Sequence, residues 1–376
     1  MNKHLPGDLA QMQSLPLEAK ITMTKLRIQQ WYDHWLGEVY VAFSGGKDST
    51  VLKHIVDSMY KDVPALFVNT GLEYPEIQRF VKDIKDGKYP CFNSDVEIVR
   101  PEMRFDEVLK THGYPVIGKR QAEAIELGRK NLQQNKYSIR LRYLGITAEE
   151  ARTMGLDLPP EEMLERYEKT VEGSKYRIAN HRHLLDAPFL VSSKCCDVMK
   201  KKPAYNYQKE TGRKPIIGTM ASESMNRESS WIRTGCNSFN GKHPSSQPLS
   251  FWTEQDIYHY IKKYDVPYCS IYGDIVVKPS DPEVPDNQMD IADYLGEYTE
   301  ADQLMTTGCN RTGCVYCAFG CQNDPDPNRF QRLKRTHPRQ YEYCIGGGEM
   351  VDGKWQPSKE GLGLGKVLDY IGVKYE

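Results

Sequence analysis

The sequence predicts an α/β fold built on a Rossmann-like parallel sheet, and two observations carry this prediction. Three short apolar runs, at 38–44, 65–71 and 96–99, have the length and composition of buried parallel strands. Segments of helical character, at 49–60 and 75–86, separate these runs. Strands that alternate with helices at this spacing are typical of a parallel sheet with helices packed on it.

The rest of the chain is assigned in order around that sheet. Residues 1–36 carry a helical apolar pattern and are expected to pack against the sheet as an N-terminal helical segment. Residues 37–265 form the α/β domain, with a helical insertion at about 104–190 and a further strand at 214–220. Residues 266–376 form a Cys-rich C-terminal region.

Later elements follow from local signals. Thr253 and Asp256 are placed to form a capping box at the start of a helix. Residues 274–290 are rich in Pro and Asp and are expected to form an exposed loop. Residues 326–344 have helical character, and the glycine-rich stretch after them is expected to be loosely ordered.

Size and composition suit a soluble globular protein of one large or two moderate domains. The chain has 376 residues, of which 39% are hydrophobic and 27% charged. The net charge of −1 provides no global basic field for nucleic acid. No apolar run approaches the roughly 18 residues of a membrane span, and the N-terminus lacks an apolar signal core. We therefore expect a cytoplasmic protein, in which ten cysteines indicate metal or redox chemistry.

A glycine loop follows the first predicted strand and is the main functional signal. Residues 44–50 read Ser-Gly-Gly-Lys-Asp-Ser-Thr and lead into a predicted helix. Glycines let backbone N–H groups approach an anion, and the helix N-terminus adds a partial positive charge. Lys47 adds a full charge. In open parallel sheets ligands bind at the carboxyl ends of strands, where residues 69–73 and 100–104 are also expected.

This loop resembles the S-G-G-K-D-S loop of the PP-loop (N-type) ATP pyrophosphatase superfamily, which holds pyrophosphate or sulfate. Residues 69–76 resemble D-T-G-x-x-F-P-E-T of its phosphoadenosine phosphosulfate (PAPS) reductase branch, with Asn69 in place of Asp. Residues 218–227 resemble G-x-R-x-x-E-S-x-x-R, but Met220 stands where that motif has arginine. Residues 247–261 resemble P-L-x-x-W-T-x-x-D-V-x-x-Y-I.

Cysteines complete the resemblance, which spans residues 38–321. Cys195 and Cys196 resemble the C-C-x-x-x-K-x-x-P segment, and Gly313 to Cys317 matches G-C-x-x-C. In adenylylsulfate (APS) reductases these two motifs ligate a [4Fe–4S] cluster. The resemblance implies an adenine nucleotide alpha hydrolase-like fold, with a helical insertion and the Cys-rich C-terminal region.

The resemblance also assigns site residues. It implies catalytic roles for Lys47, Asp48 and Arg227. Glu73 and Glu76 are expected either to bind Mg²⁺ or to cap a helix. The residues implied to bind the nucleotide are Ser44, Gly45, Gly46, Lys47, Ser49, Thr50, Asn69, Thr70, Gly71, Glu73, Gly218 and Glu223.

The cysteines leave three possibilities open. In the first, the resemblance implies a [4Fe–4S] cluster on Cys195, Cys196, Cys314 and Cys317, since four thiolates suffice. The second is a tetrahedral Zn²⁺ site that is local in sequence, and the third is no metal at all. The four zinc ligands would be Cys309, Cys314, Cys317 and Cys321. Cys309 or Cys321 is alternatively a replacement ligand or a sulfur carrier. The remaining cysteines are expected to be plain buried thiols, namely Cys91, Cys236, Cys269 and Cys344.

Three functions from different classes follow. The first is an ATP pyrophosphatase-type enzyme that adenylates a substrate and couples this to sulfur transfer. The second is an APS or PAPS reductase that releases sulfite; its C-terminal E-C-G-L-H motif is not found here, and Cys344 has a different context. The third is a non-catalytic nucleotide-binding partner protein. A sulfur donor protein or reductant, a nucleic-acid substrate and a homodimer are possible partners; no membrane is expected. The basic clusters considered for nucleic acid lie at 200–202 and 329–335.

Overall fold

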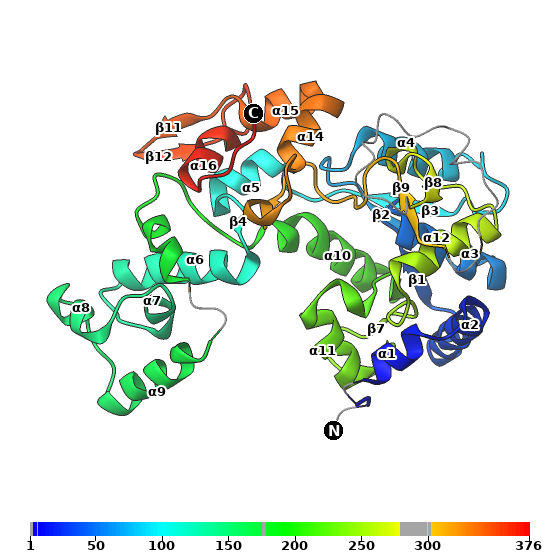
Figure 1. Ribbon diagram of the computed structural model, residues 1–376, viewed down its shortest axis with the longest axis horizontal. Helices are drawn as coiled ribbons and strands as arrows, with labels where there is room; N and C mark the ends of the chain where they lie inside the picture. The colour runs from blue at the N-terminus through cyan, green and yellow to red at the C-terminus, as the bar shows by residue number, and fades with distance from the viewer. Residues whose placement is uncertain (1–2, 6, 175–177, 279–298, 300–301) are drawn as a thin grey trace. The chain divides into compact units, whose positions relative to one another are not determined.

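The computed structural model describes residues 3–5, 7–174, 178–278, 299 and 302–376 (Figure 1). The chain divides into two compact units. The first unit comprises residues 1–69, 73–100 and 202–313, and the second comprises 70–72, 101–201 and 314–376. The three-part division expected from sequence stays a prediction. No helix among the described residues combines the length and apolar character that a bilayer span requires.

A six-stranded sheet forms the centre of the first unit and confirms the α/β prediction. Its strand order is β3-β2-β1-β5-β7-β6, and every pairing is parallel except that between β7 and β6. The strands are β1 (Val39–Ala42), β2 (Ala65–Val68), β3 (Val96–Val99), β5 (Lys214–Ile217), β6 (Asn237–Ser238) and β7 (Ser245–Ser246). In register, Val41 faces Ala65 on one side and Ile216 on the other.

Alternation along the strands buries both faces of this sheet. Val39 and Val41 belong to the main core, whereas Tyr40 lies in a separate cluster with Leu66 and Tyr207. Because successive side chains of a strand point to opposite faces, the two clusters mark the two sides of the sheet. Helix α10 (Lys202–Thr211), which carries Tyr207, therefore covers the second face.

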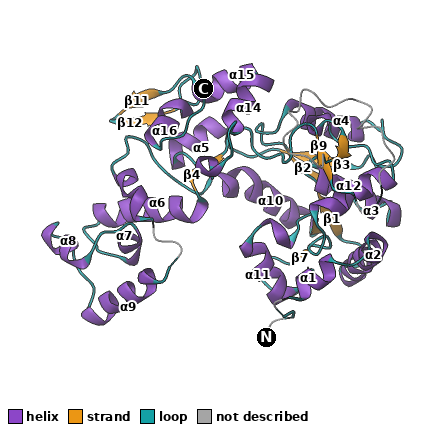
Figure 2. Cartoon of the chain, viewed as in Figure 1, coloured by secondary structure: helices purple, strands orange, loops and turns teal. Residues whose placement is uncertain are grey.

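The main core lies between the sheet and several helices of the first unit. Thr253 and Asp256 form the predicted capping box at the start of α12 (Glu254–Lys263). Asp256 also accepts hydrogen bonds from buried Lys20 of α2 (Leu17–His34), at 2.7 and 2.8 Å. Figure 2 shows the helices in purple and the strands in orange. The helices are α1 (Asp8–Gln13), α2 (Leu17–His34), α3 (Lys47–Met59), α4 (Pro75–Lys85), α11 (Met225–Thr234) and α12 (Glu254–Lys263), with short 3₁₀ turns at Ala221–Glu223 (η3) and Ser270–Tyr272 (η4).

A small antiparallel pair corrects one sequence expectation. The stretch 274–290 was predicted to be an exposed loop, but Ile275–Val277 forms strand β8, which pairs with β9 (Leu304–Thr306). Ile275 and Val276 are buried, so apolar content outweighs the Pro- and Asp-rich flank here. Residues 279–290 lie outside the described part of the chain.

The second unit is mainly helical, in agreement with the expected helical insertion. Two short parallel strands, β4 (Val116–Ile117) and β10 (Ala318–Phe319), join segments that are far apart in sequence. The helices of this part are α5 (Phe105–His112), α6 (Lys119–Gln133), α7 (Ile139–Tyr143), α8 (Ala148–Thr153) and α9 (Glu161–Glu172), with a 3₁₀ segment at Ala179–Leu185 (η1) and a π-helical turn at Asp197–Lys201 (η2).

The glycine-rich C-terminal stretch is ordered, contrary to the sequence expectation. Residues 326–344 form the expected helices, α14 (Arg329–Thr336) and α15 (Pro338–Ile345), after a 3₁₀ turn at Cys321–Asn323 (η5). The glycine-rich stretch after them forms the hairpin β11 (Glu349–Val351) and β12 (Lys354–Gln356), and then α16 (Leu364–Tyr370). A Cβ on Gly348 would lie 2.3 Å from the Trp355 ring. The Trp355 indole also donates to the carbonyl oxygen of Gly363 at 2.8 Å. Glycine serves close packing here, not looseness.

A fully buried ion pair on α3 gives a test of the first unit. Lys53 Nζ lies 2.8 Å from Asp57 Oδ2, and neither side chain is exposed. Lys53→Met would leave the Asp57 carboxylate buried without its cation, which costs about 3–5 kcal/mol. Urea denaturation should show that loss in the free energy of unfolding. Lys82→Met, at an exposed lysine of α4, is the control, and an equal loss in both variants would contradict this account.

Candidate active site

The glycine loop between β1 and α3 is held by its own hydroxyl groups. The Ser49 hydroxyl donates to the carbonyl oxygen of Gly46 at 2.9 Å and accepts from the Ser44 N–H at 3.2 Å. The Thr50 hydroxyl donates to the same Gly46 carbonyl oxygen at 3.0 Å. These contacts fix the loop at the first turn of α3, where backbone N–H groups lack helical partners and attract anions.

Two glycines are required at this loop by close approach. Gly45 has φ +72°, and a Cβ there would lie 2.8 Å from the Ile77 side chain and 2.9 Å from that of Val81. Gly218, after β5, faces the start of α3, where a Cβ would lie 3.1 Å from the Asp48 carbonyl oxygen. The predicted nucleotide residues Gly45 and Gly218 are therefore brought together with the loop by the parallel strands.

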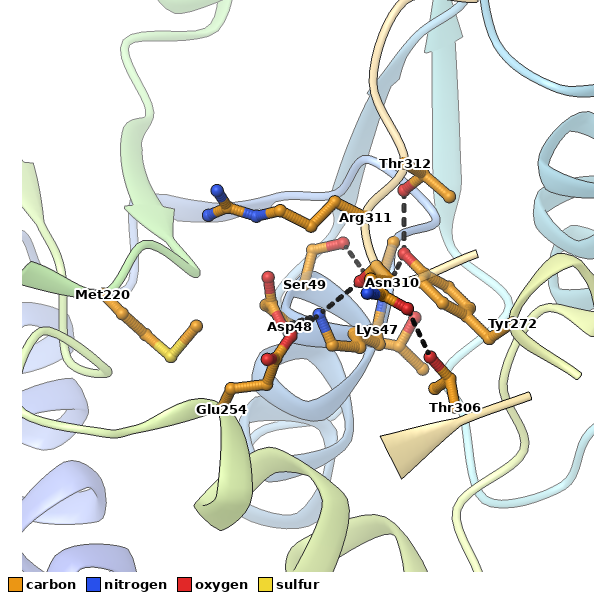
Figure 3. Close-up of polar contacts among 12 residues, drawn as sticks. Lys47, Asp48, Ser49, Met220, Glu254, Tyr272, Thr306, Asn310, Arg311 and Thr312 are labelled. Atoms are coloured by element: carbon orange, nitrogen blue, oxygen red, sulfur yellow. Dashed lines mark hydrogen bonds and ion pairs between the residues drawn. The ribbon is translucent and has the colours of Figure 1, made fainter. Parts of the chain in front are cut away.

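Lys47 is a buried cation at the first position of α3, and only 3% of its surface is exposed. Its Nζ lies 3.0 Å from Glu254 Oε1 and 3.4 Å from Asp48 Oδ1, and it donates to the Asn310 carbonyl oxygen at 3.2 Å (Figure 3). Burial raises the pKa of Asp48 despite the opposing effect of Lys47. The buried ammonium is thus compensated by anionic and carbonyl oxygens.

The segment after β9 and a tyrosine close the loop from the other side. The Tyr272 hydroxyl accepts from the Lys47 backbone N–H at 3.1 Å and lies 2.7 Å from the Thr312 hydroxyl. A Cβ on Gly46 would come within 3.1 Å of Thr312 Oγ1. A neutral hydroxyl therefore occupies the position at which an anion's oxygen would accept from the Lys47 N–H.

A second charged group lies on the segment after β5. The Glu223 carboxylate forms ion pairs with Arg227 and Arg311 and accepts from the Met220 N–H at 3.1 Å. Burial lowers the pKa of the Arg227 guanidinium, and the charge of Arg311 lowers it further. Met220, where the resembling motif has arginine, is buried with its side chain drawn near the site in Figure 3.

The predicted residues after β2 are divided between the units. Asn69 and Glu73 belong to the first unit, and the Asn69 N–H donates to the Val99 carbonyl oxygen at 2.8 Å. Thr70 and Gly71 belong to the second unit. There the Thr70 hydroxyl accepts from the Leu72 N–H at 3.1 Å, in a turn that also gives Gly71 a φ of +73°.

Four predicted ligand cysteines all lie in the second unit. Three of them belong to one apolar cluster: Cys195, Cys196 and Cys314. The Sγ atoms of the first two are 4.0 Å apart, and Cys317 interacts electrostatically with each of them. The apolar cluster also contains Leu72, Met103, Phe105, Val108, Val198, Met199, Tyr316 and Phe319.

The thiols of this group differ in how readily they lose a proton. A hydrogen bond from Cys195, helped by the charges of Lys119 and Lys200, lowers the pKa of Cys196. The same hydrogen bond and burial raise the pKa of Cys195. Burial raises the pKa of Cys314 to about 11. One thiolate with nearby lysines is therefore favoured without a metal, and further thiolates would need a bound cation.

Single-ion sites gain no support from the structure. Among the described residues, no three His, Cys, Asp or Glu side chains are grouped so that they could hold a metal ion. Cys309 lies in the first unit, where its Sγ donates to the Arg311 carbonyl oxygen at 2.8 Å, and Cys321 is buried in the second. An iron–sulfur cluster is held differently, because each thiolate binds its own iron. Of the four predicted ligands, Cys195, Cys196 and Cys314 share one apolar cluster, and Cys317 interacts electrostatically with Cys195 and Cys196. Cys91 is exposed, contrary to the expectation of a buried thiol.

Several site residues were missed from the sequence. Glu254, Tyr272, Asn310 and Thr312 contact the glycine loop or Lys47 from positions more than 200 residues away. Arg311 lies between Asn310 and Thr312, in a stretch where the cysteines were the main feature of the sequence. The sequence offered one signal for these residues. Residues 310–312 are basic or polar, and none of them is a cysteine that a metal site would explain.

Several known proteins are similar to this chain in sequence. The family model described as Phosphoadenosine phosphosulfate reductase domain matches residues 38–138 and 146–319. Adenosine 5'-phosphosulfate reductase of Oceanobacillus iheyensis is 30% identical over 98 residues, which cover 26% of this chain and 39% of that protein. The Bacillus velezensis protein of the same name is 27% identical over 89 residues, covering 23% and 37%.

Two further proteins are similar to this chain. An uncharacterized protein of Methanocaldococcus jannaschii is 32% identical over 124 residues, covering 32% of this chain and 25% of that protein. The chain therefore spans well under half the length of these relatives. A crystal structure of PAPS reductase from Candida auris in a phosphate complex has 13% identity and a TM-score of 0.33, covering 68% of this chain and 91% of that one. Because the family model matches well over half of the chain, the protein belongs to the PAPS reductase family.

Proposed function

We propose that this chain binds ATP at residues 44–50 and adenylates a substrate oxygen, which a sulfur nucleophile then replaces. Lys47 carries the proposal. Its ammonium is buried at the N-terminus of α3, next to backbone N–H groups of a glycine loop. A buried cation with this placement stabilises phosphate charge far more than an exposed lysine can.

The chemistry follows from charge development on the phosphates. A substrate oxygen attacks the α-phosphorus, the bond to the β-phosphate oxygen breaks, and pyrophosphate leaves with the negative charge. Lys47 and the loop N–H groups stabilise that charge, while Asp48 and Glu254 hold the ammonium in place. Mg²⁺ would help neutralise the phosphates. A sulfide-level nucleophile then displaces AMP from the adenylated substrate.

The cysteine group supports a role in handling sulfur. Cys195, Cys196, Cys314 and Cys317 would hold a [4Fe–4S] cluster; the first three share an apolar cluster, and Cys317 interacts electrostatically with Cys196. When bound, such a cluster would supply iron-coordinated sulfide and electron transfer. Lys119 and Lys200 favour a thiolate at Cys196 and would offset the negative charge of the ligand set.

A sulfonucleotide reductase is the second candidate, and the names of the APS reductase relatives favour it. In this alternative a cysteine thiolate would attack the sulfur of APS or PAPS, and sulfite would be released. Cys344 was the first nucleophile to consider, but its side chain is fully buried and burial raises its pKa. A thiol in that environment is a poor nucleophile, so this observation weighs against Cys344 in that role.

Other proposals concern partners. Three partner assignments stay predictions: a sulfur donor protein or reductant, a nucleic-acid acceptor and a homodimer. A cytoplasmic location and a non-catalytic nucleotide-binding role also stay predictions. In the basic cluster at 329–335, Arg329 is already paired within the chain and is less able to bind a nucleic-acid phosphate. Arg329 pairs with Asp324 and donates to the carbonyl oxygens of Cys317 and Phe319, both at 3.0 Å.

The reaction is tested with anaerobic protein given ATP–Mg²⁺, APS or PAPS separately, with a thiol reductant. We expect AMP and pyrophosphate from ATP, and a loss of at least about 100-fold in Lys47→Met, because one charged transition-state contact is worth several kcal/mol. Lys61→Met is the control. Sulfite from APS or PAPS with ATP inert would overturn adenylation and establish a reductase. Binding of nucleotide without turnover would support the non-catalytic role.

The glycine requirement gives a separate test of the binding loop. Gly45→Ala should weaken ATP binding by roughly tenfold or more, since it adds left-handed strain of about 1–2 kcal/mol to a steric clash. Gly87→Ala is the matched control, because Gly87 has φ +74° but no neighbouring atom within 4 Å of the point that a Cβ would occupy. Calorimetric titration measures both. Equal affinities for the two variants would contradict this placement of the nucleotide.

The cluster is tested through iron content. After anaerobic reconstitution with iron and sulfide, we expect about four irons per chain with visible absorbance. Cys196→Ser and Cys314→Ser should each lose most of both signals. Cys236→Ser replaces a buried cysteine of the first unit and should retain them. Equal iron in all three variants, or zinc in place of iron, would refute the assignment.

A further inference from the structure

Arg311 is an exposed cation between Asn310 and Thr312, which contact the glycine loop, and the adenylation chemistry proposed above gives it no role. Its side chain is 63% exposed, and its guanidinium pairs with Glu223 from one side while Arg227 pairs from the other. The carboxylate also accepts the Met220 N–H. Two guanidinium groups therefore share one carboxylate here, and the charge of Asp48 also acts on both arginines.

The two guanidinium charges are held close together. The pKa of Arg227 is lowered first by burial and then by the charge of Arg311. Two like charges near one carboxylate repel each other, and a bound anion would relieve that repulsion. Guanidinium groups present planar pairs of donors that match tetrahedral oxyanions such as sulfate and phosphate.

The backbone on either side fixes where Arg311 lies. The Asn310 carbonyl oxygen accepts a hydrogen bond from the Lys47 ammonium. The Thr312 hydroxyl contacts the Tyr272 hydroxyl, which itself accepts from the Lys47 backbone N–H. Arg311 therefore extends from a segment that rests on the glycine loop. Its charge also acts on Asp48, the second residue of α3. Figure 3 shows its guanidinium beyond the loop, on the side of Met220.

We infer that Arg311 is a specificity residue that binds the terminal anionic group of the nucleotide, the group beyond the α-phosphate. Glu223 holds the guanidinium ready, and Arg227 adds the second positive charge. The group bound is a tetrahedral oxyanion, which is either the terminal phosphates of ATP or the sulfate of a sulfonucleotide. This inference rests on the proposed function, since it requires a nucleotide at residues 44–50.

The test compares three ligands in calorimetric titrations with the full chain: AMP, ATP–Mg²⁺ and APS. AMP carries the α-phosphate but no terminal group. We expect Arg311→Ala to weaken whichever of ATP and APS the protein binds by roughly 10- to 100-fold, the range for a hydrogen bond between charged groups. AMP affinity should change little. Arg311→Lys keeps the charge and should lose less than Arg311→Ala.

Arg233→Ala is the matched control, because Arg233 is an exposed arginine of α11 whose guanidinium Nε donates to the Ser229 carbonyl oxygen. A loss for ATP alone assigns the terminal phosphates, and a loss for APS alone assigns the sulfate; both support the inference. If Arg311→Ala weakens AMP equally, or leaves ATP and APS unchanged in a protein that binds them, the inference is overturned while nucleotide binding stands. If the unaltered protein binds none of the three, the proposed function and this inference both fail.

Discussion

The burial of one ammonium group organises the first unit. Lys47 Nζ lies within 3.4 Å of two carboxylates and a carbonyl oxygen that come from three separate segments. A cation removed from water needs such partners, and each of them is thereby fixed in place. Glu254 at the start of α12 and the carbonyl of Asn310 are thus tied to the glycine loop by charge. The parallel sheet supplies the rigid base on which this occurs.

The arrangement has a consequence for binding. An incoming phosphate would bring negative charge to a cation that already has anionic partners, so part of the gain is offset by rearrangement of those partners. The Tyr272 hydroxyl must also leave the Lys47 N–H if a phosphate oxygen is to accept from it. Arg311 and Arg227 add two further cationic side chains, which both pair with Glu223. A ligand with several negative charges therefore suits the site better than a monoanion.

Local patterns predicted much of this molecule. Strands β1, β2, β3 and β5, the glycine loop and the capping box of α12 depend on neighbours in sequence, and they were predicted from apolar runs, glycines and Thr253. The two-residue strands β6 and β7 were not predicted. Contacts between distant segments were not predictable in this way. Tyr272 and Asn310 reach Lys47 across more than 200 residues, and nothing in their own surroundings indicates it. The glycine-rich C-terminus was misjudged because close packing around Trp355 and flexibility produce the same composition.

The most direct test of this account is a crystal structure of the chain with a non-hydrolysable ATP analogue and Mg²⁺. We predict that the terminal phosphates lie on the backbone N–H groups of residues 44–50. Lys47 Nζ should contact a phosphate oxygen, and the Tyr272 hydroxyl should have left the Lys47 N–H. An analogue bound elsewhere, with Lys47 still paired only to Asp48, Glu254 and the Asn310 carbonyl, would contradict the central claim.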